Sequence, residues 1–337
     1  MTAGAYFRRS RFAVIAGAVA ALAAAALPAT TQAKEQVTFG YLADPSHEAV
    51  MWALRNGKVT SDTIDVVATP LQIPALIQAT SARTYDVIQT AAMAIPPARA
   101  RGLDLQIMGS GLRYHTSGEG AGIWVKKDSP IKSIADLKGK RLAVYSLGSA
   151  GITLIRIALH DVYGLNVSLK DGDLTFVELP APAMPAALAT DKVDAATLIH
   201  AQAFNAMKTG EFRAIAQTAK DLTDKFKVRM VSAVIAGYGD KLKEKPAVYR
   251  EFQRVLRASM EYAKAHPTEV FPAVGKQFNI EPEFFNAWFS RFSDFPAVLS
   301  DQDVKAIDIL WSKSKELGIL KDHPPVQETI WKDAVRE

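Results

Sequence analysis

The segment 146–151, with the sequence Ser-Leu-Gly-Ser-Ala-Gly, is the part of this chain best suited to binding an anion. Its small residues let the backbone approach a ligand, and the hydroxyls of Ser146 and Ser149 lie beside the first N–H groups of a predicted helix. Unpaired N–H groups and the helix dipole favour a carboxylate, sulfonate or phosphate. The alternative is that Ser149 only caps the helix. Because ligands of open α/β sheets bind where strands end, and this segment follows a predicted strand, we expect a ligand here.

Motifs for catalysis are incomplete. His47-Glu48 begins like a helical zinc-protease signature, but Met51 stands where the second histidine is needed. Residues 147–151 resemble a nucleophile elbow, but Leu147 replaces its first glycine. A Ser149 nucleophile would also need a histidine and an acid close by, which the sequence does not show. We therefore predict that the protein is not an enzyme and has no catalytic residue.

Several classes of cofactor and partner are excluded by the composition. The chain has no cysteine, which rules out disulfides, Cys-ligated zinc, iron–sulfur clusters and thiol nucleophiles. It has no phosphate-loop signature, and its six histidines show no metal-ligand spacing. We predict no metal and no cofactor. The net charge of +5 falls to about +2 without the arginines of residues 1–33, so no nucleic-acid partner is expected.

The elements that position segment 146–151 alternate between strands and helices. This order predicts βαβ units and a mainly parallel sheet in each of two α/β lobes. We read 109–122 as a connection between the lobes and place a second crossing at 228–237, after which the chain becomes helical. The predicted strands are 37–41, 64–67, 85–89, 105–108, 123–125, 141–145, 174–179, 193–198 and 212–216, and the predicted helices include 47–55, 74–81, 94–101, 150–163, 186–190 and 248–263.

The ends of the other predicted strands extend this candidate site. By the same argument from sheet topology, residues after the first and third strands and in the second lobe should face the ligand. Some of these side chains could equally belong to the core. The residues that we predict to contact the ligand are Tyr41, His47, Thr90, Ala91, Met93, Ser146, Leu147, Gly148, Ser149, Ala150, Met184 and His200.

Residues 1–33 are expected to be an export signal. Three arginines at positions 8, 9 and 11 precede an apolar, alanine-rich run from 12 to 27, and small residues lead to Ala33. This run is shorter than the ~20 residues that a spanning helix needs. We therefore expect a leader that is cleaved after Ala33 and a mature periplasmic protein, exported by the general or the twin-arginine route.

Residues 36–320 resemble the solute-binding proteins of ABC importers. The most specific part is Asp136-Leu137-Lys138-Gly139-Lys140 within 123–144, followed by the Ser/Gly-rich segment 146–151. The small-residue run 186–196 and the segment 101–105 are also similar to that family. The resemblance is greatest to the branch that includes proteins for sulfonates, taurine, nitrate and thiamine precursors.

This resemblance implies a two-lobed periplasmic-binding-protein fold of type II, often called a Venus flytrap, in which each lobe is a mostly parallel sheet flanked by helices. Lobe 1 would comprise 34–112 and 229–337, and lobe 2 would comprise 113–228. The protein would be a monomer that captures a small organic solute and delivers it to a membrane permease served by a separate ATPase subunit. Enzymes of the yeast pyrimidine-synthase type in this family use a Cys-rich segment, which this chain lacks.

The identity of the solute stays open at this stage. An anion such as a sulfonate, carboxylate or aromatic acid fits segment 146–151, but no arginine clamp is evident in the strand-end loops, so a neutral heterocycle remains an alternative. An exported hydrolase or isomerase acting on a small organic acid is the alternative function.

Overall fold

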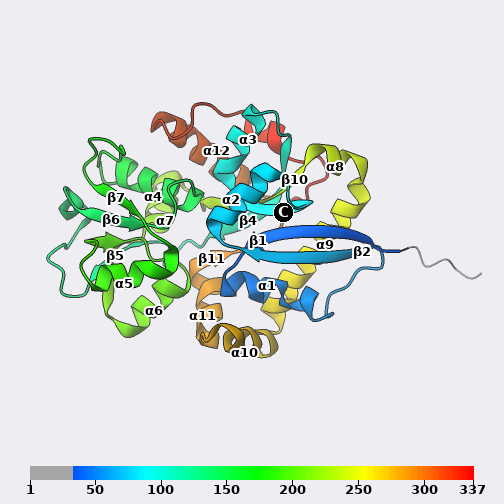
Figure 1. Cartoon of the computed structure of the whole chain (residues 1–337), viewed down its shortest axis with the longest axis horizontal. Coiled ribbons are helices and arrows are strands. Elements are labelled where there is room, and N and C mark those ends of the chain that lie inside the picture. The colour runs from blue at the N-terminus through cyan, green and yellow to red at the C-terminus, as the bar shows by residue number, and fades with distance from the viewer. Residues whose placement is uncertain (1–32) are drawn as a thin grey trace, which may run out of the picture. The chain divides into compact units, whose positions relative to one another are not determined.

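The computed structural model describes residues 33–337, of which Lys34–Glu337 form one compact unit. Two β-sheets with helices on their faces make up this unit (Figure 1). The predicted leader, residues 1–33, lies outside the described residues except for Ala33.

The first sheet has six strands within the described residues, in the order β11-β4-β10-β3-β1-β2. β1 pairs in parallel with β2 and β3, whereas β10 is antiparallel to both β3 and β4. Strands β1 to β4 therefore share one direction. The bounds are β1 Glu35–Leu42, β2 Ile64–Leu71, β3 Val87–Ala91, β4 Leu105–Tyr114, β10 Val231–Tyr238 and β11 Ser293–Asp294.

The second sheet has five strands in this part of the chain, in the order β7-β6-β8-β5-β9. β6 is parallel to β7 and β8, and β5 is antiparallel to β8 and β9. The bounds are β5 Ile123–Lys126, β6 Arg141–Val144, β7 Thr175–Glu178, β8 Ala195–Ala196 and β9 Phe212–Ala216.

Both sheets have the same arrangement of strands. In each sheet, four strands share one direction and one antiparallel strand lies between the last two of them along the chain. This strand is β10, between β3 and β4, in the first sheet, and β5, between β8 and β9, in the second. Each inserted strand is the first strand that the chain enters after passing from one sheet to the other. The chain therefore passes twice between the sheets. Four strands of each sheet share one direction, as the prediction of parallel sheets requires, and the remaining strands make both sheets mixed.

Two predicted connections are strands for much of their length. β4 continues through Tyr114, into the segment predicted to connect the lobes, and β10 occupies most of the second predicted crossing. The glycines that suggested a connection instead allow close packing on a strand. A Cβ on Gly109 would lie 2.8 Å from the backbone oxygen of Ala297, and the Ser110 N–H donates to the Val298 carbonyl at 2.8 Å.

Three of the described helices, α1, α4 and α12, begin at a residue whose side chain caps the helix. Asp44 caps α1 by accepting the Ser46 N–H at 2.9 Å, and Ser300 forms a capping box with Asp303 at the start of α12. Around the first sheet lie α1 Pro45–Arg55, α2 Ile73–Ala82, α3 Ile95–Ala100, α8 Gly239–Glu244, α9 Pro246–Ala265, α10 Pro267–Phe278, α11 Pro282–Ala287 and α12 Asp301–Glu316. Around the second lie α4 Ala150–Asp161, α5 Met184–Ala189, α6 Ala201–Thr209 and α7 Thr218–Phe226.

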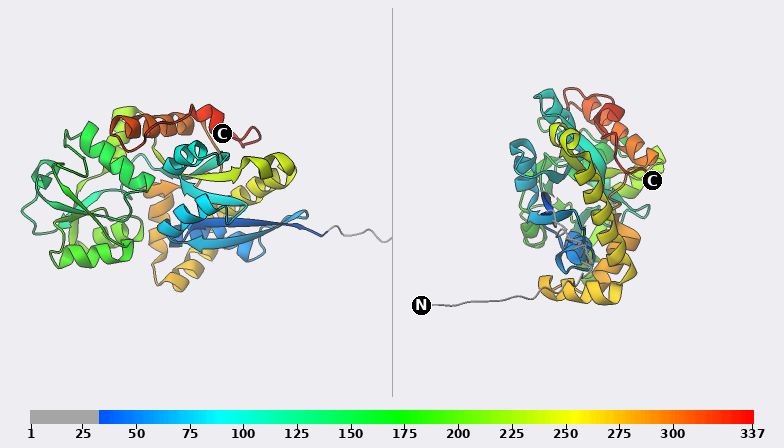
Figure 2. Two further views of the ribbon diagram at one scale, coloured as in Figure 1. Left: turned by 45° about the horizontal axis from the view of Figure 1, so that its top comes forward. Right: turned by 90° about the vertical axis from the view of Figure 1, so that its right-hand side faces the viewer.

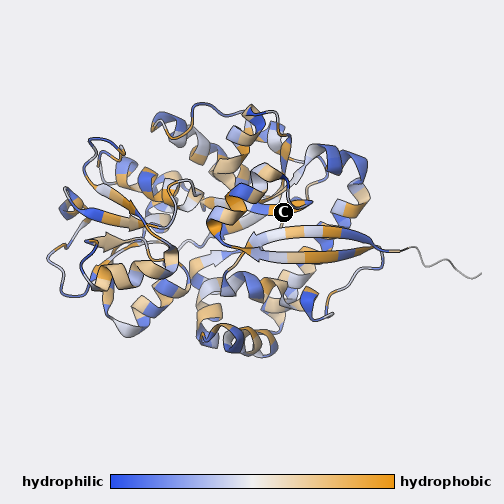
Figure 3. Cartoon of the chain, viewed as in Figure 1, coloured by the Kyte–Doolittle hydropathy of each residue, from blue (hydrophilic) through white to orange (hydrophobic). Residues whose placement is uncertain are grey.

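Helix α4 packs against the hydrophobic cores of both sheets. Leu154, Ile157 and Ala158 belong to the cluster that includes residues of β4 and β10, whereas Ile152 and Ile155 belong to the core of the second sheet. Figure 3 shows many hydrophobic residues along the strands and a mixture of hydrophobic and hydrophilic residues on the surrounding helices. The start of α4, where segment 146–151 lies, is therefore held between the two sheets.

Candidate functional site

A cavity lies between the two sheets at the carboxyl ends of their strands. About 610 Å³ of space in and around it is free of protein atoms, counting the part open to solvent. The first sheet and its helices contribute Leu42, Ile73, Leu76, Ile77, Gln89, Thr90, Ala91, Leu112, Tyr114, Ser232 and Ala233. The second contributes Tyr145, Ser149, Ala150, Gly151, Ile199 and His200.

The wall of this cavity is mainly apolar. Its polar groups are two tyrosines, three hydroxyls of Ser and Thr, one amide and one histidine, and none of its lining residues is Arg, Lys, Asp or Glu. An apolar wall with a few convergent polar groups is typical of a site that binds a small organic molecule in one orientation.

Tyr114 and Tyr145 converge on the start of α4. A Cβ on Gly151 would lie 2.0 Å from the Tyr145 hydroxyl and 3.2 Å from that of Tyr114, so a glycine is needed at this position. Burial raises the pKa of Tyr114 to about 12 and raises that of Tyr145 further. Both hydroxyls are therefore protonated at neutral pH and can donate hydrogen bonds to a ligand.

Ser149 is the N-cap of α4. Its hydroxyl accepts the Ile152 N–H at 3.2 Å and donates to the Ser146 carbonyl at 2.9 Å. Both interactions are local, so this hydroxyl has no histidine partner in the structure. The Ser149 hydroxyl therefore caps the helix, which is the alternative considered from the sequence. Because Ser149 also lines the cavity, the first N–H groups of the helix lie beside the cavity.

His200 connects the two sheets across the cavity. It follows β8, and its Nδ1 lies 2.9 Å from Oδ2 of Asp44, which caps α1 at the end of β1. The backbone of His200 has φ +48° and ψ −119°, a conformation that non-glycine residues rarely adopt. Since Nδ1 faces Asp44, the other ring nitrogen is the one available for a ligand.

A second histidine, His47, lies next to the His200–Asp44 pair. Gln89 donates through Nε2 to Nε2 of His47 at 2.8 Å, and the Leu42 N–H donates to the Gln89 oxygen at 2.9 Å. His47 therefore accepts at Nε2 and carries its proton at Nδ1, towards Asp44. Burial lowers the pKa of His47, consistent with a neutral ring.

Asp44 is the charged member of this cluster. Burial opposes its ionisation, but the interaction with His200, together with a smaller contribution from the nearby His47 ring, holds the pKa of its carboxyl well below the usual value. A carboxylate is therefore present at neutral pH, and it orients the His200 ring.

The structure brings five of the predicted residues to the cavity. Thr90 and Ala91 come from the end of β3, Ser149 and Ala150 from the start of α4, and His200 from the loop after β8. These come from predicted strand ends of both lobes.

The other seven predicted residues do not line this cavity. Met93 and Met184 are buried in the hydrophobic cores of the two sheets, because each lies within the first turn after a strand-end loop and points inward. Tyr41 is also in the core, where its hydroxyl donates to Glu48 at 2.7 Å. His47 and Ser146 are buried, and Leu147 and Gly148 line a separate groove.

Sequence reasoning missed several residues of the wall. Tyr145 ends the predicted strand 141–145 and could have been found by the same strand-end argument. Tyr114 and Ser232 lay in segments interpreted as connections, and Ile73 and Ile77 in a helix not expected to face the ligand. No sequence pattern separates such side chains from core residues.

The described residues contain neither a metal-binding cluster nor a membrane-spanning helix. Between residues 33 and 337, no group of three or more His, Cys, Asp or Glu side chains is placed to hold a metal ion. None of the helices in that range is long and apolar enough to cross a membrane.

The fold and the interlobe cavity place this chain among proteins with the periplasmic-binding-protein fold. It is similar to the aliphatic sulphonate binding protein SsuA of Escherichia coli, with a TM-score of 0.68 and 18% identity over 90% of this chain and 94% of that one. The alkanesulfonate-binding protein SsuA of Xanthomonas axonopodis pv. citri, bound to MOPS, gives a TM-score of 0.67 and 19% identity over 91% and 100%. A ligand-binding component of an ABC-type import system from Staphylococcus aureus, with zinc bound, gives 0.69 and 13% over 90% and 100%.

The family is established by the sequence itself. A family model described as NMT1/THI5 like matches residues 64–270, which is more than half of the chain. The chain therefore belongs to the NMT1/THI5-like family. No curated protein gives a significant match to it.

Proposed function

We propose that this chain is the extracytoplasmic solute-binding subunit of an ABC importer, and that one small organic solute binds in the cavity between its sheets. The observation that carries this proposal is that strand ends of both sheets contribute to a single mainly apolar wall. The family and the similar solved structures support it.

In this proposal residues 34–112 and 229–337 act as one lobe and 113–228 as the other. An open form exchanges with a closed form, and a solute that contacts both lobes favours closure. Contacts between these two parts that closure would make or break include the His200–Asp44 pair and the rings of Phe204 and Phe284, whose centroids are 5.8 Å apart.

The solute that fits the wall best is a small organic acid with an apolar body. Its acidic group would lie against the start of α4, where the hydroxyls of Tyr114 and Tyr145 and the first N–H groups of the helix can all donate. Its body would contact Ile73, Leu76 and Leu112. Because no arginine or lysine lines the cavity, we propose a single negative charge on the solute rather than two.

The cellular setting follows from the same proposal. Residues 1–33 would direct export to the periplasm, and the mature chain would be a monomer that delivers its solute to a membrane permease with a separate ATPase subunit. The protein would bind the solute without changing it chemically. The Ser149 hydroxyl, which donates to a backbone carbonyl, supports binding over nucleophilic catalysis.

The test is to purify the protein from the extracytoplasmic fraction, denature it and identify released molecules by mass spectrometry. The expected result is one unmodified organic acid in about equal molar amount, which rebinds to the emptied protein in calorimetric titration. A released neutral heterocycle would contradict the proposed solute class but not the binding function. Turnover of the rebound molecule would overturn the binding function in favour of an exported hydrolase or isomerase.

A further inference from the structure

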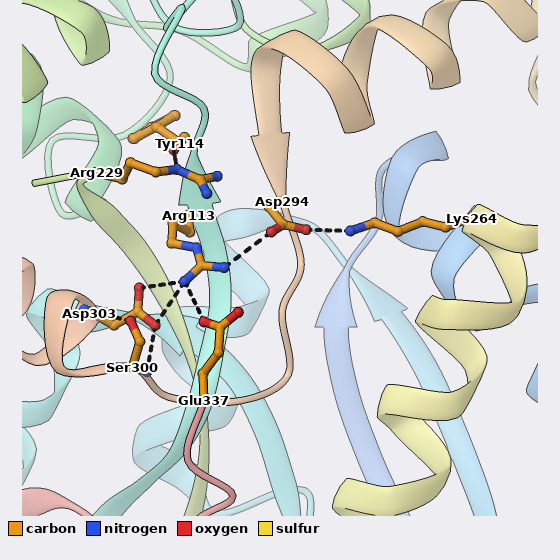
Figure 4. A network of polar contacts seen from close by, with 8 residues as sticks. All are labelled: Arg113, Tyr114, Arg229, Lys264, Asp294, Ser300, Asp303 and Glu337. Carbon is orange, nitrogen blue, oxygen red and sulfur yellow. Dashed lines mark hydrogen bonds and ion pairs between the residues drawn. The ribbon is translucent and has the colours of Figure 1, made fainter.

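Two arginines are buried among the described residues, and their surroundings differ. Arg113 is 8% exposed and Arg156 is 6% exposed. Arg113 contacts carboxylates of Asp294, Asp303 and Glu337 at 3.2, 3.3 and 3.0 Å (Figure 4). The charge of this arginine is thus compensated inside the protein.

Arg156, on α4, has no such compensation. Its Nη2 donates to the Val167 carbonyl at 3.0 Å, and its guanidinium lies 5.7 Å from the ring centroid of Phe176. Its Nε is buried without a hydrogen-bond partner, and no charged side chain of residues 33–337 perturbs its pKa. A guanidinium has five N–H donors, and one of those of Arg156 is bonded to another protein group. Burying an unpaired charge is unfavourable, and burial accordingly lowers the pKa of Arg156.

Arg156 lies on the wall of a groove separate from the solute cavity. On its side the groove is lined by His160, Asn166 and Ser168, which can also donate hydrogen bonds. The opposite side is formed by Glu316 and residues 317–319, at the end of α12. Figure 2 shows α12 extending along the outside of the first sheet towards the helices of the second.

The groove contains one acidic residue, and that residue already has a partner. Glu316 accepts from Lys313 at 2.6 Å and is exposed to solvent, so its charge is partly neutralised and screened. Arg156 is therefore the buried charge in this groove that lacks a counter-ion.

We propose that the groove binds a small oxyanion, such as phosphate, sulfate or a carboxylate, through the guanidinium of Arg156, with Ser168 and Asn166 as further donors. Planar guanidinium groups hold oxyanions by paired charge-assisted hydrogen bonds. This site involves residues of both halves of the chain and does not depend on the proposed import function.

The test is calorimetric titration of the purified protein with phosphate, sulfate or acetate at an ionic strength held constant with sodium chloride. Saturable binding of at least one of these anions to a single site is expected, and the comparison of the three identifies the preferred class. Arg156→Met should weaken this binding about tenfold or more, and Arg156→Lys should weaken it less. Arg141→Met is the matched control, because Arg141 is exposed, pairs with Asp194 and lies outside the groove.

Either of two results would overturn the proposal: no saturable binding to the wild-type protein, or equal affinity in the Arg156→Met variant. If that variant does not fold, NMR of the wild-type arginine side chains decides the matter. The Arg156 Nε–H signal should then shift saturably with the anion, and an unshifted signal would contradict the site. Solute binding in the cavity is measured separately and can fail or succeed without affecting this result.

Discussion

Replacing Ser149 with aspartate should greatly weaken the binding of an anionic solute while leaving the fold intact. Aspartate is as good an N-cap as serine, and its charge interacts favourably with the helix start. The variant loses the hydrogen bond from Ser149 to the Ser146 carbonyl, so the free energy of unfolding should fall by only about 1 kcal/mol.

The loss of affinity can be worked from the position of Ser149 on the cavity wall. With the acidic group of the proposed solute against the start of α4, we take a separation of about 5 Å from a carboxylate at position 149, at which two like charges repel by about 3 kcal/mol at an effective dielectric constant near 20. This repulsion corresponds to roughly a hundredfold increase in Kd. Calorimetric titration with the solute identified by mass spectrometry measures the change directly.

Ser300→Asp is the matched control. Ser300 also caps a helix through its hydroxyl, at the start of α12, and does not line the cavity. Its replacement should leave the Kd unchanged. Unchanged affinity in Ser149→Asp would remove Ser149 from the site, and equal losses in both variants would show that the effect is not local.

Four further predictions concern the cavity and the packing around it. Tyr145→Phe, which removes one donor at the start of α4, should raise the Kd about tenfold with little change in thermal stability, as titration and a melting curve would show. Asp44→Asn keeps a good N-cap but removes the charge between the two sheets, so solute affinity should fall by a similar factor while α1 stays folded by circular dichroism. The pKa of His47 is lower in the folded than in the unfolded chain, so the unfolded chain binds more protons on acidification. The free energy of unfolding, measured with urea, should therefore fall below about pH 6.5 by up to about 1.4 kcal/mol per pH unit. His47→Asn should reduce this slope. Gly109→Ala should cost about 2 kcal/mol of stability because its Cβ would meet backbone at 2.8 Å, whereas Gly148→Ala, with its nearest contact at 3.8 Å, should cost little.

Much of the fold could be predicted from the order of elements. Short apolar runs alternating with helical patterns indicated βαβ units, and β9 begins and ends where the sequence placed it. β11 was not predicted, β8 is only two residues long, and β10 and the second half of β4 were expected to be connections. Their glycine, serine and alanine residues look like a connection, but they form strands because neighbouring backbone packs directly on them. Local propensity cannot show such a contact, since it depends on a segment almost two hundred residues away.

The candidate site was predictable only in part. The rule that ligands bind at strand ends located Thr90, Ser149 and His200. It could not distinguish these from Met93 and Met184, which come from equivalent positions but turn into the cores. Which way a side chain points after a strand depends on the first turn of the following helix, and that turn is set by packing.

The sequence by itself determined the α/β fold class: its alternating elements, and the helix start at segment 146–151, follow from residue types and spacing alone. Only the tertiary structure decided what surrounds that helix start. Tyr114 reaches Gly151, and Asp44 pairs with His200, although these residues are distant in the sequence. The buried Nε of Arg156 has no partner because of what the fold packs around it. Their roles depend on distance and burial, which a linear pattern does not contain.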